Sequence, residues 1–129
     1  MTRIIAGSLD KLGHPHFQLG VYGISKKHSL NVDAMLDTGF SGFLNLPLAH
    51  CLKTGLVLYS TTSYKLADGR QSSTILCLGT IVLPNLQEVT GVVSIDFNTT
   101  ETLLRIEFLK KVGGILEINI KKSSVKIKL

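Results

Sequence analysis

The stretch Met35-Leu36-Asp37-Thr38-Gly39-Phe40-Ser41-Gly42 is the most informative part of this chain. Two apolar residues lead into an aspartate, and a threonine, a glycine and a serine follow within four positions. Gly39 permits a tight loop and a close approach of the backbone, and the hydroxyls of Thr38 and Ser41 lie within reach of a carboxylate in such a loop. The pattern predicts a carboxylate oriented at the end of a buried strand. It occurs once, so chemistry that needs two such carboxylates requires a second copy of the chain.

The length and composition indicate a globular protein. A chain of 129 residues fits one domain, residues 1–129, with a core of its own. Hydrophobic residues make up 44% and charged residues 18%, which disfavours disorder. We find no apolar run of membrane-spanning length and no charged-then-apolar leader, so we expect a cytoplasmic protein without a membrane partner. Cys51 and Cys77 are too few for a disulfide framework or a four-cysteine zinc site, and we expect buried thiols.

The chain is basic, with a net charge of +5, and half of its cations lie near the C-terminus. This pattern favours a solvated hairpin whose edge carries charges. Tryptophan is absent and aromatic residues make up 6%, so the stacking platforms of single-strand binders are not visible and no nucleic-acid partner is expected. A basic β-barrel that binds RNA stays open as a less favoured alternative. The cations beyond position 104 are Arg105, Lys110, Lys111, Lys121, Lys122, Lys126 and Lys128.

Short apolar runs separated by Gly, Pro and Asn predict an all-β fold. Asp68-Gly69 between two such runs is a strong hairpin signal. Helices are expected at residues 48–54, between Pro47 and Gly55, and at residues 99–112, where apolar side chains have helical spacing. Strands are expected at residues 2–9, 17–23, 30–36, 43–46, 61–66, 72–78, 80–83, 88–95, 115–120 and 125–129.

A carboxylate held like Asp37 is an oriented acid or base, but one alone is poor at hydrolysing a peptide bond. Two carboxyl groups that share a proton let one activate water while the other protonates the carbonyl oxygen, because like charges in contact cannot both ionise. A two-fold axis through the loop would supply the second Asp37. The competing interpretation is an aspartate that caps its own turn.

The longer string around Asp37 resembles the active-site loop of the aspartic proteases, especially the single-lobe, retroviral-type (retropepsin-like) branch. Two later segments fall in the family's order. Tyr64-Lys65-Leu66-Ala67-Asp68-Gly69, with residues 70–74, looks like the flap hairpin of bacterial members, and Leu103-Leu104-Arg105-Ile106-Glu107-Phe108-Leu109 looks like the segment that opens a C-terminal helix. The resemblance runs from about residue 17 to residue 129. It implies a closed, barrel-like β fold with a flap hairpin and one or two short helices.

The resemblance also implies a role for each matching residue. Asp37 would be the catalytic carboxylate, paired with Asp37 of the partner chain in a homodimer. Thr38 would lie in the interlocking loop under the pair, and Gly39 would bring its backbone to the substrate or the water. Ser41 would bond and orient the carboxylate.

The flap would close over an extended peptide or protein substrate. Its tip would be formed by Ala67, Asp68 and Gly69, although Asp68 also suits a plain turn. The implied reaction is hydrolysis of a peptide bond by water, with no cofactor and no metal. The chain departs from the family at Arg105, where a glycine usually follows the apolar pair. This departure supports the alternative of an inactive domain of the same fold that binds extended peptides or mediates dimerisation.

Other polar residues give weaker signals. His14, His16 and His28 have no partner cluster at metal-ligand spacing, and we expect surface histidines. Asp96 precedes Phe97-Asn98-Thr99, which indicates a turn or a helix cap. Ser41 has no histidine and aspartate at a recognisable spacing, so a serine hydrolase is disfavoured.

Overall fold

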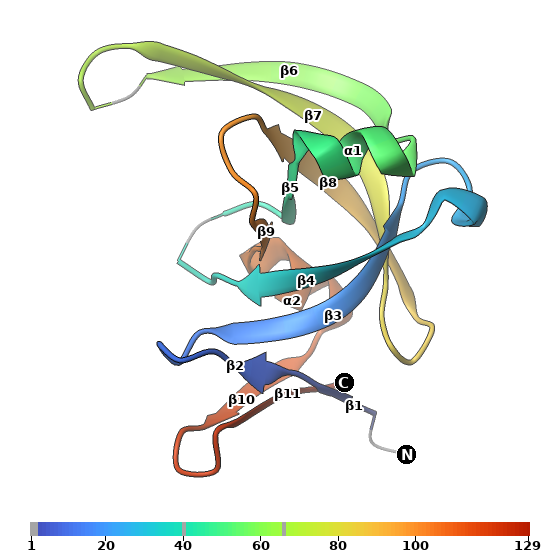
Figure 1. Ribbon diagram of the computed structural model, residues 1–129, viewed down its shortest axis with the longest axis vertical. Coiled ribbons are helices and arrows are strands. Elements are labelled where there is room, and N and C mark those ends of the chain that lie inside the picture. The colour runs from blue at the N-terminus through green and yellow to red at the C-terminus, as the bar shows by residue number, and fades with distance from the viewer. Residues whose placement is uncertain (1–2, 40, 66) are drawn as a thin grey trace.

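The structure is a computed structural model that describes residues 3–39, 41–65 and 67–129. It is mostly β, with 52% strand and 14% helix. Within the described residues six strands close into a barrel, because β7 pairs back onto β3 (Figure 1). The predicted all-β, closed-barrel fold is therefore confirmed. In order around the barrel, the strands are β3 (Pro15–Tyr22), β4 (Leu30–Leu36), β9 (Thr102–Leu104), β5 (Leu44–Pro47), β8 (Glu88–Asp96) and β7 (Gln71–Val82).

Further strands extend this barrel at both ends. β6 (Val57–Lys65) pairs with β7 as a long antiparallel hairpin, which reaches beyond the barrel at the upper left of Figure 1. β2 (Ser8–Leu9) continues the sheet from β3. At the opposite end, β1 (Ile4–Ala6), β11 (Ser124–Lys128) and β10 (Ile115–Asn119) form a separate antiparallel sheet. The terminal hairpin predicted from the lysine-rich sequence is present as β10 and β11.

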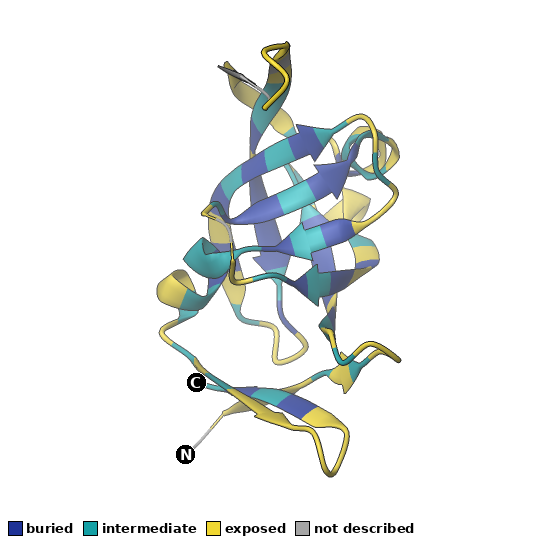
Figure 2. Cartoon of the chain, turned by 90° about the vertical axis from the view of Figure 1, so that its left-hand side faces the viewer, coloured by how far each residue is buried: buried dark blue, intermediate teal, exposed yellow. Residues whose placement is uncertain are grey.

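The alternation of apolar and polar residues explains why these strands form. In β4, Val32, Ala34 and Leu36 are buried, whereas Asn31 and Asp33 are exposed. Figure 2 shows the same alternation along the neighbouring strands, with exposed residues gathered in the turns. Burying each large apolar side chain stabilises the fold by about 1.5–3 kcal/mol. The largest fully buried side chains include Phe17, Leu44, Leu46, Ile81, Leu104 and Phe108.

Two short α-helices accompany the strands of the described chain. α1 (Leu48–Thr54) has the predicted bounds and ends at Gly55, whose φ of 63° is left-handed. α2 (Ile106–Val112) ends at Gly113 in the same conformation. A 3-10 turn, η1 (Lys26–His28), is capped by Ser25, whose hydroxyl oxygen accepts a hydrogen bond from Lys27 N–H. Neither α-helix has the length or the apolar run needed to cross a bilayer.

The predicted helix at residues 99–112 is wrong in its first half. Residues 102–104 form β9, which lies between β4 and β5, and the helix begins only at Ile106. Thr102 and Leu104 are almost fully buried there, and the strand completes the hydrogen bonding of both neighbours. This tertiary pairing outweighs the helical spacing of the apolar side chains. Residues 80–83 also differ from expectation, because residues 80–82 continue β7 and do not form a separate strand.

Candidate active site

The loop that contains Asp37 connects β4 to β5 and is held at both ends by the segment from β9 to α2. Asp37 N–H donates to Leu104 O at 2.8 Å, where β4 and β9 run in parallel. On the far side of the loop, Arg105 N–H donates to Phe43 O at 3.0 Å, and Glu107 N–H donates to the carbonyl of Gly42 at 2.9 Å. These main-chain bonds fix where the side chain of Asp37 emerges.

The Asp37 carboxylate has a main-chain N–H group beside one oxygen and a guanidinium beside the other. Gly39 N–H donates to its Oδ1 at 3.0 Å, as in a turn that the aspartate closes on itself. Its Oδ2 lies 3.9 Å from Nη1 of Arg105, whose side chain is only 13% exposed. Gly42 has a φ of 111°, which favours glycine, and an added Cβ there would lie 3.7 Å from Cγ of Arg105. Asp37 of the loop thus forms an ion pair with Arg105, which directly precedes α2.

The other predicted residues of the loop lie at its surface. Thr38 and Gly39 are exposed. Ser41 is exposed and lines a cavity together with Arg105. Among the hydrogen bonds of residues 3–39, 41–65 and 67–129, the expected one from Ser41 to Asp37 is not found. Phe40, which completes the sequence string, lies outside the described residues.

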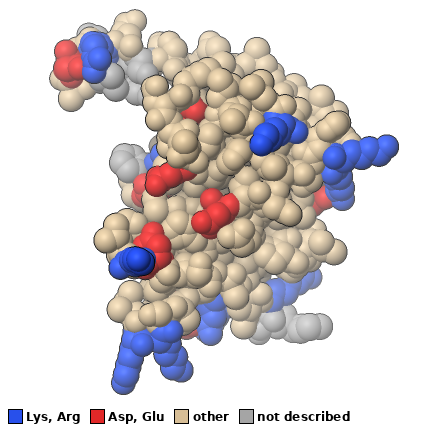
Figure 3. All heavy atoms as spheres, viewed as in Figure 1, with Lys and Arg blue, Asp and Glu red and all other residues tan. Residues whose placement is uncertain are grey.

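At the position of the predicted flap, β6 and β7 form an antiparallel hairpin, and residues 67–70 make its turn. Asp68 Oδ1 accepts a hydrogen bond from Arg70 N–H at 3.0 Å, and Asp68 Oδ2 accepts from Arg70 Nε at 2.6 Å. Gly69 supplies the positive φ of the turn, at 86°, and Ala67 is exposed beside it. Leu66 lies outside the described residues. Figure 3 shows this tip projecting from the body, with an acidic and a basic side chain together.

A cavity of about 580 Å³ lies between the Asp37 loop and the base of the hairpin. Its described lining residues come from five parts of the chain and carry mainly hydroxyl and amide groups. Ser73 and Thr74 of β7 place it below the hairpin, whereas the turn residues 67–69 do not line it. The remaining lining residues are Ser41 of the loop, Asn45 of β5, Ser94, Ile95, Asp96, Phe97 and Asn98 at the end of β8, and Arg105.

Asp96 has the turn role that its sequence context predicts. Its Oδ1 accepts a hydrogen bond from Asn98 N–H at 2.8 Å. The position of Asp96 on the cavity wall was not predicted, because it depends on the parallel pairing of β5 with β8.

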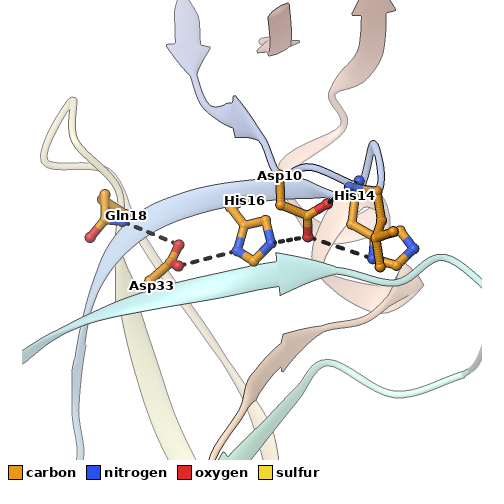
Figure 4. A network of polar contacts seen from close by, with 6 residues as sticks. Asp10, His14, His16, Gln18 and Asp33 are labelled. Carbon is orange, nitrogen blue, oxygen red and sulfur yellow. Dashed lines mark hydrogen bonds and ion pairs between the residues drawn. The ribbon is translucent and has the colours of Figure 1, made fainter. Parts of the chain in front are cut away.

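His16 is a partly exposed histidine that is held by two acidic side chains, which the sequence did not predict. Its ring lies between two carboxylates, with Nε2 2.8 Å from Asp10 Oδ2 and Nδ1 3.2 Å from Asp33 Oδ2 (Figure 4). Burial opposes the charged ring, but the bond to Asp10 and the charge of Asp33 outweigh burial and raise the pKa of His16. The pKa of Asp10 is lowered to about 2, first by the main-chain N–H of His14 and then by His16.

This network lies on the strand pair that presents Asp37. His16 on β3 pairs in register with Met35 on β4, two residues before Asp37. His14 and Asp37 consequently line the same hollow, together with Thr38 and Leu116 of β10. The antiparallel register could have predicted this proximity, because residues 14 and 37 are opposite one another when 16 is opposite 35. The described residues contain no group of three or more histidine, cysteine or acidic side chains placed to hold a metal ion.

The cysteines are separated from this site. Cys77 is buried and Cys51 is partly buried, and both are free thiols. Burial raises the pKa of the Cys51 thiol to about 11, and the adjacent Cys77 adds to this effect. The expected buried thiols are therefore confirmed for Cys77 and are partly correct for Cys51.

Two solved protease structures have a backbone arrangement similar to that of this chain. A retropepsin-like aspartic protease from Rickettsia conorii superposes with a TM-score of 0.73 over 99% of this chain and 92% of that chain, at 18% identity. The chain has a retropepsin-like fold. The EIAV protease, solved in complex with the inhibitor HBY-793, superposes with a TM-score of 0.57 over 82% of this chain and 94% of the other, at 15% identity. Searches with family models and among curated proteins found no match to the sequence.

The retropepsin-like fold confirms the fold implied by the sequence string, including the two helices. It extends over nearly the whole chain, further than the segment from residue 17 that the sequence resemblance covers. At identities below 20% the likeness concerns the arrangement of the backbone. The function depends on the residues that this backbone positions.

Proposed function

We propose that the chain is an aspartic-type endopeptidase that acts as a homodimer, with Asp37 of one protomer paired with Asp37 of its partner. The observation that supports this most is the position of the Asp37 carboxylate in a retropepsin-like fold. It follows a buried strand directly, its main-chain N–H donates to Leu104 O, and its Oδ1 accepts from Gly39 N–H. A cavity lined by Ser41 and Arg105 opens next to this loop, below a long hairpin. A second copy related by a two-fold axis would supply the second carboxylate.

The chemistry follows from two carboxyl groups that share one proton. The ionised carboxylate takes a proton from water as the water oxygen attacks the peptide carbonyl carbon. The protonated carboxyl gives its proton to the carbonyl oxygen, which produces a neutral tetrahedral diol. The carbon–nitrogen bond then breaks as the leaving nitrogen takes a proton from the carboxyl that accepted one from water. One hydroxyl of the diol gives its proton to the other carboxylate, which restores the starting pair. The products are a new carboxyl terminus and a new amine.

The surrounding residues have supporting roles in this proposal. Thr38 lies beneath the carboxylate pair, Gly39 presents its backbone to the substrate or the water, and Ser41 lies beside the peptide. The turn at Ala67, Asp68 and Gly69 closes over an extended substrate, which binds as an added strand between the turn and the Asp37 pair.

Arg105 supports a second candidate function. Its guanidinium lies 3.9 Å from the Asp37 carboxylate, as a fixed counter-charge. In this alternative the same groove holds extended peptides without cutting them.

The test compares Asp37→Asn with Glu101→Gln, which removes an exposed acid away from the loop. The substrate is an unfolded protein at mildly acidic pH, and the oligomeric state is measured by sedimentation at low micromolar concentration. We expect Asp37→Asn to lower the cleavage rate by about 10³-fold or more while the dimer persists, and Glu101→Gln to cleave normally. Undiminished cleavage by Asp37→Asn contradicts the proposal. A wild-type chain that binds the unfolded protein without cleaving it favours the peptide-binding alternative.

A further inference from the structure

The cavity beside Asp37 has walls that suit a particular kind of side chain. Among its described lining residues, the apolar ones are Ile95, which is 1% exposed and belongs to the core, and Phe97 at the outer rim, which is 53% exposed. The rest of the wall carries hydroxyl, amide and charged groups. An apolar side chain placed here would remove water from these groups without replacing the hydrogen bonds, which costs free energy.

The charges of the cavity nearly cancel. Arg105 contributes one positive charge, and its Nη1 lies 3.9 Å from Asp37 Oδ2. Asp96 contributes a negative charge from the end of β8. A carboxylate in the cavity would be attracted by Arg105 but repelled by Asp37 and Asp96. An ammonium group would be attracted by Asp37 and Asp96 but repelled by Arg105. Either kind of ion would therefore be repelled by a charge of its own sign.

A carboxamide avoids this conflict, because it has both an acceptor and two donors and carries no charge. Its oxygen can accept from a guanidinium N–H of Arg105, and its NH₂ group can donate to the carboxylate of Asp96. Further hydrogen-bond donors and acceptors are supplied by the side chains of four other lining residues, Ser41, Asn45, Ser94 and Asn98.

We propose that this cavity receives a glutamine or asparagine side chain of an extended peptide, close to the bond that is cut, and that Arg105 and Asp96 determine this preference. That a peptide bond is cut near this cavity rests on the proposed function, whereas the preference for a carboxamide side chain concerns binding alone. Arg105 is then a specificity-determining residue. In this proposal the counter-charge beside Asp37 also serves as the donor that selects the substrate.

The first experiment uses a set of peptides with one backbone sequence that differ at a single position within two residues of the cut. That position is Gln, Asn, Glu, Lys or Leu, and kcat/KM is measured for each peptide. We expect the Gln or Asn peptide to exceed the Glu, Lys and Leu peptides by about tenfold. The set is repeated with the varied residue at each position within two residues of the cut, and a preference for Glu, Lys or Leu at every one of them overturns the inference.

The variants identify the residues responsible. Arg105→Met keeps the length of the side chain but removes its donors, and it should abolish the preference for carboxamides over Leu. Asp96→Asn keeps an acceptor for Asn98 N–H and should raise the rate for the Glu peptide relative to Gln. Lys53→Met removes an exposed cation in α1 and should leave the preference unchanged. A preference that survives both cavity variants contradicts the assignment.

A binding measurement separates this inference from the proposed catalysis. Fluorescence anisotropy with the same labelled peptides is measured on Asp37→Asn, alone and combined with Asp96→Asn, which also tests the cavity if Arg105→Met does not fold. Carboxamide-selective binding supports the inference even where the wild-type chain cuts nothing, and in that case only the proposed protease function fails. Equal binding of all peptides, or binding of none, overturns the inference.

Discussion

The main-chain N–H of Asp37 donates a 2.8 Å hydrogen bond to the carbonyl oxygen of Leu104, a residue far away in the sequence. The side chain of Leu104 is fully buried, and the next residue supplies the guanidinium beside the Asp37 carboxylate. The packing of one leucine thus positions both members of the ion pair. Changes to this packing should affect the site even though Leu104 does not line the cavity.

We expect Leu104→Ala to reduce the free energy of unfolding by about 2–5 kcal/mol, because it leaves a void in a fully buried position. The main-chain bond to Asp37 does not need the side chain, so the loss reports packing. Urea denaturation followed by circular dichroism measures the change. Leu12→Ala is the control, since Leu12 is 82% exposed and should change stability little. Equal effects of the two substitutions would contradict the assigned core.

The Asp10–His16–Asp33 network predicts a dependence of stability on pH in two directions. The pKa of His16 is raised above 6.5, so its contribution is complete below that pH and is lost as pH rises through the pKa of the folded state. The pKa of Asp10 is lowered from 3.8 to about 2, so its contribution is complete above 3.8 and is lost as pH falls towards 2. The network therefore stabilises the fold most between about pH 4 and 6.5.

Denaturation of wild type and His16→Gln from pH 3 to pH 9 tests this pH dependence. The difference in stability between the two proteins should be largest between pH 4 and 6.5 and should shrink at higher pH. His28→Gln is the control, since His28 is exposed in η1. A difference between wild type and His16→Gln that does not vary with pH would show that the ring contributes only by packing.

The thiols should react slowly in the native protein. Burial raises the pKa of Cys51 from 9.0 to about 11, which lowers the thiolate fraction at pH 8 about a hundredfold. Cys77 is buried and its pKa is raised as well. Ellman's reagent at pH 8 should label both thiols slowly in buffer and rapidly in urea. The single variants Cys51→Ala and Cys77→Ala assign the two phases, and rapid labelling of native Cys51 would refute the assigned environment.

The turn of the hairpin should affect function more than stability. Asp68→Ala removes both bonds to Arg70, whereas Asp68→Asn keeps an acceptor for Arg70 N–H and removes the charge. Since the turn is exposed, both variants should stay within about 0.5 kcal/mol of wild type. If the turn closes over the substrate, Asp68→Ala should raise KM severalfold and Asp68→Asn less. Identical kinetic constants for both variants and wild type would argue against contact between turn and substrate.

The sequence predicts much of this architecture because most elements are determined locally. The strand at residues 30–36 and the helix before Gly55 appear with the expected bounds. The Asp-Gly hairpin forms where it was predicted, although its strands are longer, Val57–Lys65 and Gln71–Val82. β9 could not be predicted in this way, since its three residues are strand only because β4 and β5 lie on either side. The same limit applies to the ion pair of Asp37 with Arg105 and to His16 between its carboxylates, because each depends on contacts between separate segments.

The position of β9 has a consequence for how the chain acquires its site. The loop at residues 37–43 is encoded early, but the main-chain groups that hold it belong to residues 104, 105 and 107. Contacts between segments distant in sequence form late in folding. A chain still emerging from the ribosome therefore makes its hairpins before its Asp37 loop is in place. Pulse-labelling hydrogen exchange should show the Asp37 amide protected after those of β7 and β8. Such a delay would leave the Asp37 loop without its main-chain partners until residues 104–107 have been synthesised.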